Sequence, residues 1–258
     1  MTQFLFITDL DHTLVGDDQA MEGLNRKLEL YRQQHNTKIV YSTGRSLYLY
    51  QQLEQQQNHK QIALLQPNIL ICAVGTEIYS YNHQDQLIIN NQWSENLSED
   101  WDRELVVKIA ANFTQLKPQP ESEQRPFKVS YFLQEKTALQ IVSDLEKALL
   151  QQTLDIQVIY SDNKDLDILP RKANKGMAMT FVREYLEIEP AKTVACGDSG
   201  NDIALFANRK EKGIIVANAK QELLDWHNEN PSENRYLAKA EFAAGIEEGL
   251  RHFGFLGE

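Results

Sequence analysis

The sequence contains few cysteines, fewer basic than acidic side chains, and no long apolar run. Its 258 residues include only Cys72 and Cys196, each inside an apolar stretch, so both are expected to be small buried hydrophobes and no disulfide framework is implied. No apolar run approaches the roughly 20 residues that a membrane span needs. The start of the chain also has no basic region before its apolar stretch, as a secretory signal would. We therefore expect a cytoplasmic protein with no membrane partner.

The shortage of positive charge restricts the partners further. Lysine and arginine total 26 against 37 acidic residues, which gives a formal net charge of −11. A nucleic acid needs a basic face, so no nucleic-acid partner is expected. The hydrophobic content of 42% is enough to build a sizeable core. We expect a folded protein that works as a monomer on a small molecule.

Short continuous apolar runs alternate with helical patterns in most of the chain. Runs of this kind are typical of strands that are buried on both faces of a parallel sheet. The predicted strands are Phe4–Thr8, Lys38–Ser42, Ile69–Ala73, Thr193–Cys196 and Gly213–Ala217. The predicted helices between them are Gln19–Gln34, Ser46–Gln56, Lys175–Leu186 and Asn201–Ala207. This alternation predicts the α/β class, with a Rossmann-like, doubly wound core.

The middle of the chain interrupts this alternation. There we predict two helices and two strands, at Ser98–Phe113, Phe127–Leu133, Thr137–Leu150 and Ile156–Tyr160. Such a mixture indicates an α+β cap domain at 81–165, inserted into a core domain formed by 1–80 and 166–258. The alternative is that this region extends the main sheet.

Two carboxylates follow the first predicted strand, in Asp9-Leu10-Asp11. Residues two apart in an extended segment point to the same side, and ligands of open α/β sheets bind at the carboxyl ends of strands. Adjacent carboxylates repel each other unless they share a cation, and Mg²⁺ prefers oxygen ligands. One carboxylate can then act as a nucleophile and the other as a general acid and base. The alternative is a turn with two capping aspartates.

Two further segments have features of an anion site. Thr43, Gly44, Arg45 and Ser46 follow the second predicted strand and precede a helix, whose first N–H groups favour anions. Ser46 by itself is explained as a helix cap. Lys175 lies at another helix start, where a lysine opposes the helix dipole unless an anion is near. An exposed lysine that tolerates the dipole is the alternative.

A second acidic segment follows the fourth predicted strand, in Gly197-Asp-Ser-Gly-Asn-Asp202. Asp198 is placed to complete a magnesium site, and Asp202 to bind the metal or to orient its water. A capping turn is the alternative. Calcium is not favoured, because the spacing of the twelve-residue calcium loop is absent.

The order of these motifs resembles the haloacid dehalogenase superfamily of phosphotransferases. Within it, six stretches resemble sucrose-phosphate phosphatases of the cyanobacterial and plant type, and the similarity reaches Leu256, so the extra C-terminal domain of the plant forms is expected to be absent. The stretches are 7–13, 42–46, 73–78, 126–131, 169–176 and 196–202. The resemblance implies hydrolysis of sucrose 6-phosphate to sucrose and phosphate, with Mg²⁺ as cofactor.

The resemblance also implies roles for individual residues. Asp9 is the implied nucleophile and Asp11 the general acid and base, with Thr43 and Lys175 as the other catalytic residues. The implied magnesium ligands are Asp9, Asp11 (through its main-chain carbonyl), Asp198 and Asp202. The implied substrate-binding residues are Thr43, Gly44, Arg45, Lys128, Ser130, Lys164, Lys175 and Asn201.

Other functions are compatible with the same motifs. The substrate can be another sugar phosphate, such as mannosyl-phosphoglycerate, glucosylglycerol phosphate or trehalose phosphate. From a different class, the chain can be a non-catalytic subunit that binds a sugar phosphate. Sucrose-phosphate synthase is a candidate partner because it makes the implied substrate.

Overall fold

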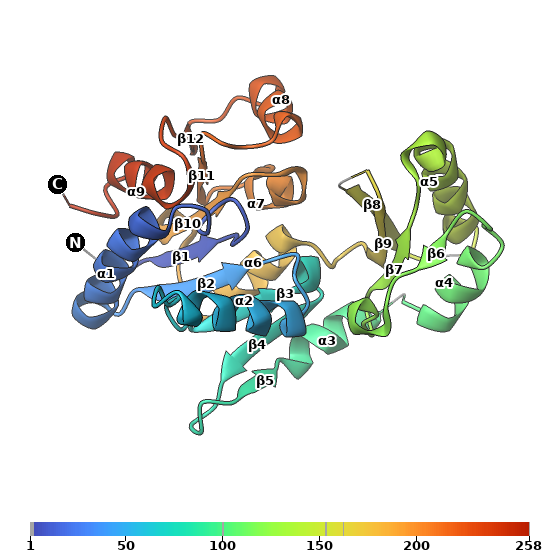
Figure 1. The fold of residues 1–258 in the computed structure, drawn as a ribbon, viewed down its shortest axis with the longest axis horizontal. Helices are drawn as coiled ribbons and strands as arrows, with labels where there is room; N and C mark the ends of the chain where they lie inside the picture. Colours follow the sequence, from blue (N-terminus) through green and yellow to red (C-terminus); the bar gives the residue numbers. More distant parts are fainter. Residues whose placement is uncertain (1–2, 100, 153, 162, 258) are drawn as a thin grey trace. The chain divides into compact units, whose positions relative to one another are not determined.

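The computed structural model describes residues 3–99, 101–152, 154–161 and 163–257. The chain forms two compact units, of which the first contains residues 1–89 and 174–258 and the second contains residues 90–173. The ribbon in Figure 1 follows the chain from the first unit into the second and back. No helix in the described ranges is both long and apolar enough to cross a membrane.

An eight-stranded sheet forms the centre of the first unit, in the order β12-β11-β10-β1-β2-β3-β4-β5 among the described residues. Neighbouring strands from β12 to β3 are parallel, whereas β4 and β5 are antiparallel at one edge. The strands are β1 (Leu5–Thr8), β2 (Lys38–Ser42), β3 (Ile69–Cys72), β4 (Glu77–Tyr81), β5 (Leu87–Ile89), β10 (Thr193–Gly197), β11 (Lys212–Ile215) and β12 (Arg235–Leu237).

Helices cover both faces of this sheet. The helices are α1 (Asp18–His35), α2 (Leu47–His59), α6 (Lys175–Tyr185), α7 (Ile203–Phe206), α8 (Gln221–Glu229) and α9 (Phe242–His252). Phe6 and Tyr41 of the sheet share one core cluster with Leu24 of α1, Tyr50 of α2 and Ile246 of α9. The contacts of α6 with β3, and of α7 with β10 and β11, lie on the opposite face. Strand residues therefore point alternately into two apolar layers, which explains why the runs are continuously apolar.

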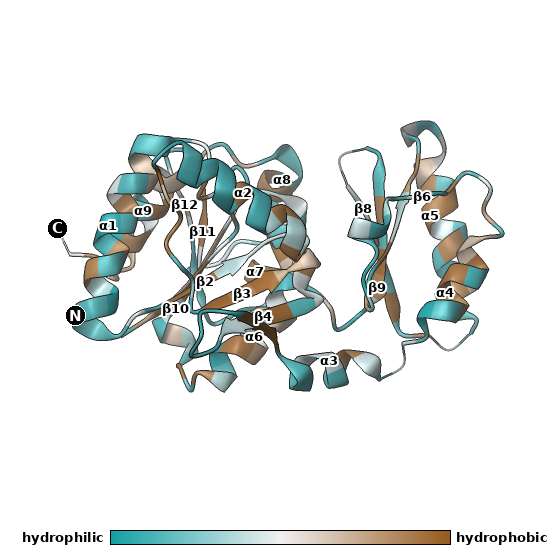
Figure 2. Ribbon diagram, turned by 60° about the horizontal axis from the view of Figure 1, so that its bottom comes forward, coloured by the Kyte–Doolittle hydropathy of each residue, from teal (hydrophilic) through white to brown (hydrophobic). Residues whose placement is uncertain are grey.

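The second unit is a smaller α+β structure. In its described residues, a four-stranded antiparallel sheet has the order β6-β7-β9-β8. The elements are α3 (Asn91–Ser98), α4 (Arg103–Ala110), β6 (Lys117–Pro118), β7 (Val129–Phe132), α5 (Glu135–Leu150), β8 (Ile156–Ser161) and β9 (Asp165–Pro170). One face of the sheet packs on α4 and α5 through an apolar cluster that includes Val129, Leu145 and Ile168. Figure 2 shows the alternation of apolar and polar residues on α4 and α5. The fold class is therefore confirmed, with a parallel-rich α/β core and an inserted α+β unit.

The details within the chain correct several predictions. The predicted core segment 166–258 wrongly included most of β9, which pairs with β7 and β8 in the small sheet. The units divide after residues 89 and 173, because the β4–β5 hairpin pairs with the large sheet. The single helix predicted at Ser98–Phe113 is also wrong. The Asp102 side chain accepts a hydrogen bond from the Leu105 N–H at 2.9 Å and caps a shorter α4, while α3 was missed.

Candidate functional site

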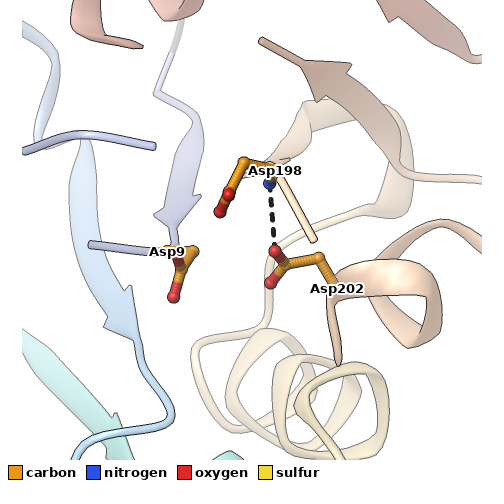
Figure 3. A group of neighbouring side chains, drawn as sticks. All are labelled: Asp9, Asp198 and Asp202. Atoms are coloured by element: carbon orange, nitrogen blue, oxygen red, sulfur yellow. Dashed lines mark hydrogen bonds between the residues drawn. The ribbon is translucent and has the colours of Figure 1, made fainter. Parts of the chain in front are cut away.

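The candidate site lies where two central parallel strands end. Asp9 follows β1 directly, and Asp198 follows β10. The two strands are paired in register, and the Asp9 N–H continues the ladder with a 3.0 Å hydrogen bond to the Cys196 carbonyl. Their side chains consequently meet at one edge of the sheet, as Figure 3 shows together with Asp202. The sequence reasoning predicted this convergence from strand ends alone.

Three aspartates form a buried acidic cluster at this edge. Asp9, Asp198 and Asp202 each contribute a carboxylate oxygen, and these oxygens lie within 4.8 Å of one another. The relative exposures of the three residues are 5%, 2% and 0%. Carboxylates this close and this dry are stable only with a cation or a shared proton. Mg²⁺, which prefers oxygen ligands, fits this set of donors.

Lys175 supplies the positive charge that the protein itself brings to the cluster. It is the first residue of α6 and has no exposed side-chain surface. Its ammonium donates to Asp9 Oδ1 at 2.8 Å and to Asp202 Oδ1 at 2.7 Å. Asn174 caps the helix by accepting a hydrogen bond from the Met177 N–H, which fixes where Lys175 leaves the backbone. The anion that its position predicted is therefore a pair of carboxylates of the protein.

The loop after β10 holds Asp202 in place. Asp202 Oδ2 accepts hydrogen bonds from the backbone N–H groups of Asp198 at 3.0 Å and Ser199 at 3.1 Å, and the first is the dashed line in Figure 3. Ser199 and Asp202 form a reciprocal capping box at the start of a short 3₁₀ turn. The second oxygen of Asp202 faces Lys175. Asp202 thus has a structural role in the loop and an electrostatic role at the cluster.

Thr13 links the two ends of the cluster, and the sequence reasoning missed it. Its hydroxyl lies 2.9 Å from Asp198 Oδ1 and 3.3 Å from Asp9 Oδ2. The Thr13 N–H bonds to the Leu10 carbonyl at 3.3 Å, so the turn after β1 brings the hydroxyl back to the site. The available signal was a hydroxyl residue four positions after Asp9.

Burial dominates the electrostatics of the cluster. Desolvation raises the pKa of Asp9 to about 7, although Lys175 acts to lower it, and the charges of Asp202 and Asp198 raise it further. Desolvation and the charge of Asp202 also raise the pKa of Asp198. Desolvation alone would lower the pKa of Lys175, but Asp202 and Asp9 outweigh it and raise that pKa above its ordinary value. Lys175 stays charged, but its single positive charge does not balance the three aspartates, so the cluster keeps an excess of negative charge.

Asp11 lies outside this cluster and pairs with Arg45. Arg45 Nε and Nη2 each donate to one oxygen of Asp11, and both distances are 2.7 Å. The side chains are partly exposed, at 40% for Asp11 and 28% for Arg45. The hydrogen bond to Asp11 raises the pKa of Arg45. Both residues were predicted for the site, but their pairing was not.

Thr43 and Gly44 lie beside the same edge of the sheet. Thr43 is fully buried, and its hydroxyl accepts a hydrogen bond from the Arg45 N–H at 3.1 Å. A Cβ atom placed on Gly44 would first meet the Asn201 side-chain amide, 3.9 Å away, so Gly44 and Asn201 are neighbours. Ser46 accepts a 3.4 Å hydrogen bond from the Leu49 N–H and so caps α2, as predicted from the sequence. Of the predicted substrate-binding residues, Gly44 and Asn201 therefore lie side by side, and Thr43 and Arg45 flank Gly44 in the chain.

The second unit contains the other predicted substrate-binding residues. Ser130 is buried on β7 and Lys128 is buried directly before that strand, and both contact Asp167 of β9, at 2.6 Å and 3.4 Å. Asp167 was not predicted, although the alternation Asp165-Leu-Asp167 indicated a strand with one polar face. Lys164 is separate from this group and exposed, with its ammonium 3.8 Å from Asp165. The structure thus brings Lys128 and Ser130 together and leaves Lys164 apart.

Known proteins resemble this chain over nearly its whole length. A probable sucrose-phosphatase 2 from Arabidopsis thaliana is 39% identical, and the match covers 97% of this chain and 60% of the plant protein. A mannosylfructose-phosphate phosphatase from Agrobacterium fabrum is 30% identical over 97% of this chain and 96% of its own length. The chain therefore spans about 60% of the plant relatives that it matches.

Solved structures agree with these relatives. The sucrose-phosphatase of Synechocystis sp. PCC6803, solved in complex with sucrose and phosphate, is 40% identical with a TM-score of 0.87, and the match covers 100% of both chains. The fold is shared with haloacid dehalogenase-like hydrolases. Residues 2–254 match the family described as sucrose-6F-phosphate phosphohydrolase. The chain belongs to this family, as its motifs indicated.

Proposed function

We propose that this protein is a magnesium-dependent phosphatase that hydrolyses sucrose 6-phosphate to sucrose and phosphate. The observation that carries the proposal is the buried cluster of Asp9, Asp198 and Asp202 around Lys175, at the carboxyl end of central strands. The family membership and the sucrose-phosphatases among its relatives support sucrose 6-phosphate as the substrate.

In the proposed reaction, Asp9 attacks the phosphorus atom and the sugar oxygen leaves with a proton from Asp11. The resulting bond between Asp9 and phosphorus is then cleaved by a water molecule, from which Asp11 takes back a proton. Lys175 is placed to offset charge on the transferring group. Because Arg45 holds both oxygens of Asp11, this pair must open for Asp11 to deliver its proton.

The metal ion has a defined place in this proposal. Asp9, Asp198 and Asp202 are the side chains that would hold Mg²⁺, together with the main-chain carbonyl of Asp11. The bound cation would supply positive charge for the phosphate oxygens and would keep Asp9 ionised against its raised pKa. The excess negative charge of the metal-free cluster supports this assignment.

We assign recognition of the sugar to the second unit, as a cap. Lys128, Ser130 and Asp167 form a buried polar group in this unit, beside its apolar core. Buried polar groups of this kind suit the hydroxyls of a sugar, since they offer fixed donors and acceptors. Thr43, Gly44 and Asn201 are assigned to the phosphate end of the substrate.

Phosphate release from a panel of substrates tests the proposal. The panel is sucrose 6-phosphate, trehalose 6-phosphate and glucose 6-phosphate, each with Mg²⁺ and with a chelator. We expect the highest kcat/KM with sucrose 6-phosphate, only when Mg²⁺ is present, and no turnover by Asp9→Asn. Asp18→Asn, at the start of α1 and outside the acidic cluster, is the control that should keep full activity. Normal turnover by Asp9→Asn or in chelator would contradict the mechanism.

One second candidate has its own support. The mannosylfructose-phosphate phosphatase matches along 96% of its length, so phosphorylated mannosylfructose is the rival substrate. Adding that compound to the panel separates the two. A higher kcat/KM for it than for sucrose 6-phosphate would move the assignment, while the chemistry at Asp9 would stand.

A further inference from the structure

The first unit also contains a charged pocket, which lies at the amino ends of the parallel strands and not at their carboxyl ends. Its volume is about 290 Å³, and it is lined by the segment after α7, the end of α8 and the start of β12. These are the amino ends of β11 and β12, whereas the acidic cluster lies at the carboxyl ends of β1 and β10. The pocket is therefore separate from the candidate active site.

The charge of this pocket is opposite to that of the protein as a whole. Its polar lining residues are Asn208, Arg209, Trp226, Asn230, Ser232 and Arg235. None of the described residues that line it is acidic, although the chain carries a net charge of −11. Within the described ranges, neither arginine forms an ion pair with a carboxylate: Arg209 donates to the Ala204 carbonyl and to Thr180, and Arg235 donates to groups of α8 and the residue after it.

Arg235 is held in a fixed position. Its Nε donates to His227 Nδ1 at 2.7 Å, and its Nη2 donates to the carbonyls of His227 and Asn230. The guanidinium carbon also lies 4.4 Å from the centre of the Trp226 ring. These contacts use Nε and Nη2, and in the described part of the chain Nη1 has no hydrogen-bond partner. A half-buried, pre-positioned guanidinium with unused donors is well suited to an oxyanion.

Burial strengthens the attraction between these two arginines and a bound anion. It lowers the pKa of Arg235, and it is the main cause of the lowered pKa of Arg209. At Arg235 no carboxylate of the described residues acts against this effect. The uncharged groups of Asn208, Asn230 and Ser232 add hydrogen-bonding capacity around the two arginines. The volume limits the occupant to a small molecule.

We infer that this pocket is a second binding site, for a small metabolite that carries a phosphate group, with Arg235 as its main anchor. The same chemistry would admit free orthophosphate or a small phosphate ester. The inference does not depend on the proposed activity, because it concerns other residues at the opposite edge of the sheet.

Trp226 provides a direct measurement. The protein has three tryptophans, of which Trp93 and Trp101 belong to the second unit, so its indole ¹H–¹⁵N NMR spectrum holds one signal from the pocket and two internal references. Trp226→Phe assigns the signal. Orthophosphate and glycerol 3-phosphate are titrated separately into protein in chelator. Without a divalent cation the acidic cluster repels oxyanions, so binding there does not interfere.

We expect a saturable shift of the Trp226 signal with both probes. Tighter binding of glycerol 3-phosphate indicates an ester as the occupant, and equal binding indicates the free ion. Arg235→Gln should weaken binding about tenfold or more, and Arg235→Lys should give a smaller loss because it keeps the charge. Arg251→Gln, an exposed arginine paired with Glu247, should bind as the wild type does.

A structural role for Arg235, as a clamp on the end of α8, would give a different result. The variants would then lose stability, but the wild-type Trp226 signal would not saturate with phosphate. The same shift with potassium chloride at equal ionic strength would also overturn the inference. Undiminished binding in a folded Arg235→Lys and in Arg235→Gln would remove Arg235 as the anchor.

Discussion

The raised pKa of Asp9 makes the stability of the metal-free protein depend on pH in an unusual direction. Desolvation is the main cause, and it raises the pKa from 3.8 to about 7 in the folded state. Between these values the folded protein keeps the Asp9 proton and the unfolded chain loses it. The stability that this proton contributes is complete below about pH 4 and is lost as the pH rises to about 7.

The size of this effect follows from the shift. The difference of about three pKa units corresponds to about 4 kcal/mol of unfolding free energy, at about 1.4 kcal/mol per unit. The neutral variant Asp9→Asn lacks the titrating group. Its stability relative to the wild type should therefore rise between pH 4 and 7, and we expect it to be the more stable of the two at pH 7.5 without metal.

Urea unfolding in chelator at pH 4.5, 5.5, 6.5 and 7.5 measures this difference. Mg²⁺ should stabilise the wild type at neutral pH far more than Asp9→Asn, because the ion competes with the proton for the same carboxylate. Parallel curves of unfolding free energy against pH for the two proteins would refute the reasoning. Asp18→Asn serves again as the control, since its carboxylate is partly exposed at the start of α1, where it pairs with Lys60 and not with the acidic cluster.

Three further predictions concern single side chains. Lys175→Met leaves the carboxylates without their buried partner, so we expect a loss of about 3–5 kcal/mol in metal-free urea unfolding and a loss of turnover; unchanged stability would contradict the buried ion pairs. Gly176→Ala places a Cβ 1.9 Å from the Ala204 carbonyl oxygen and should lower the melting temperature, whereas Gly23→Ala, which meets nothing within 4 Å inside α1, should gain about 1 kcal/mol. Equal melting temperatures for the two glycine variants would contradict the close packing of α6 against α7. Ser130→Ala removes a buried hydroxyl that donates a 2.6 Å hydrogen bond to the Asp167 carboxylate. In steady-state kinetics we expect it to raise the KM for sucrose 6-phosphate about tenfold and to change the KM for a smaller phosphate ester little. An equal effect on both substrates would show that Ser130 does not recognise the sugar.

The strands of the core were predictable because their signal is local. A continuous apolar run such as Phe4–Thr8 suits only a strand covered on both faces, and the alternation with helices predicts a parallel sheet. Short edge strands carry a weaker signal. β5 and β12 have three residues each and are partly exposed, so their sequences resemble loops, and only pairing with β4 and β11 makes them strands.

The positions of the site residues were predictable for a related reason. In a parallel sheet the carboxyl ends of all strands lie on the same side, so Asp9 after β1 and Asp198 after β10 were expected on that side once both runs were read as parallel strands. The pairing of β1 with β10 then brings the two residues together. The order of the motifs along the chain also indicated the family to which the protein belongs. Both inferences use the identity of residues near strand ends and need no coordinates.

From its position after a strand alone, Asp9 could be either a catalytic nucleophile or a residue that caps a turn. The tertiary structure decided which side chains surround it. The sequence by itself indicated that Asp9, Asp198 and Lys175 belong to one site at the carboxyl ends of the strands. Only the fold decided that Lys175 is fully buried between Asp9 and Asp202, that Thr13 joins Asp9 to Asp198, and that Arg45 takes Asp11 away from them. Burial and hydrogen-bond distances depend on side chains that are far apart in the chain, and no local pattern encodes them.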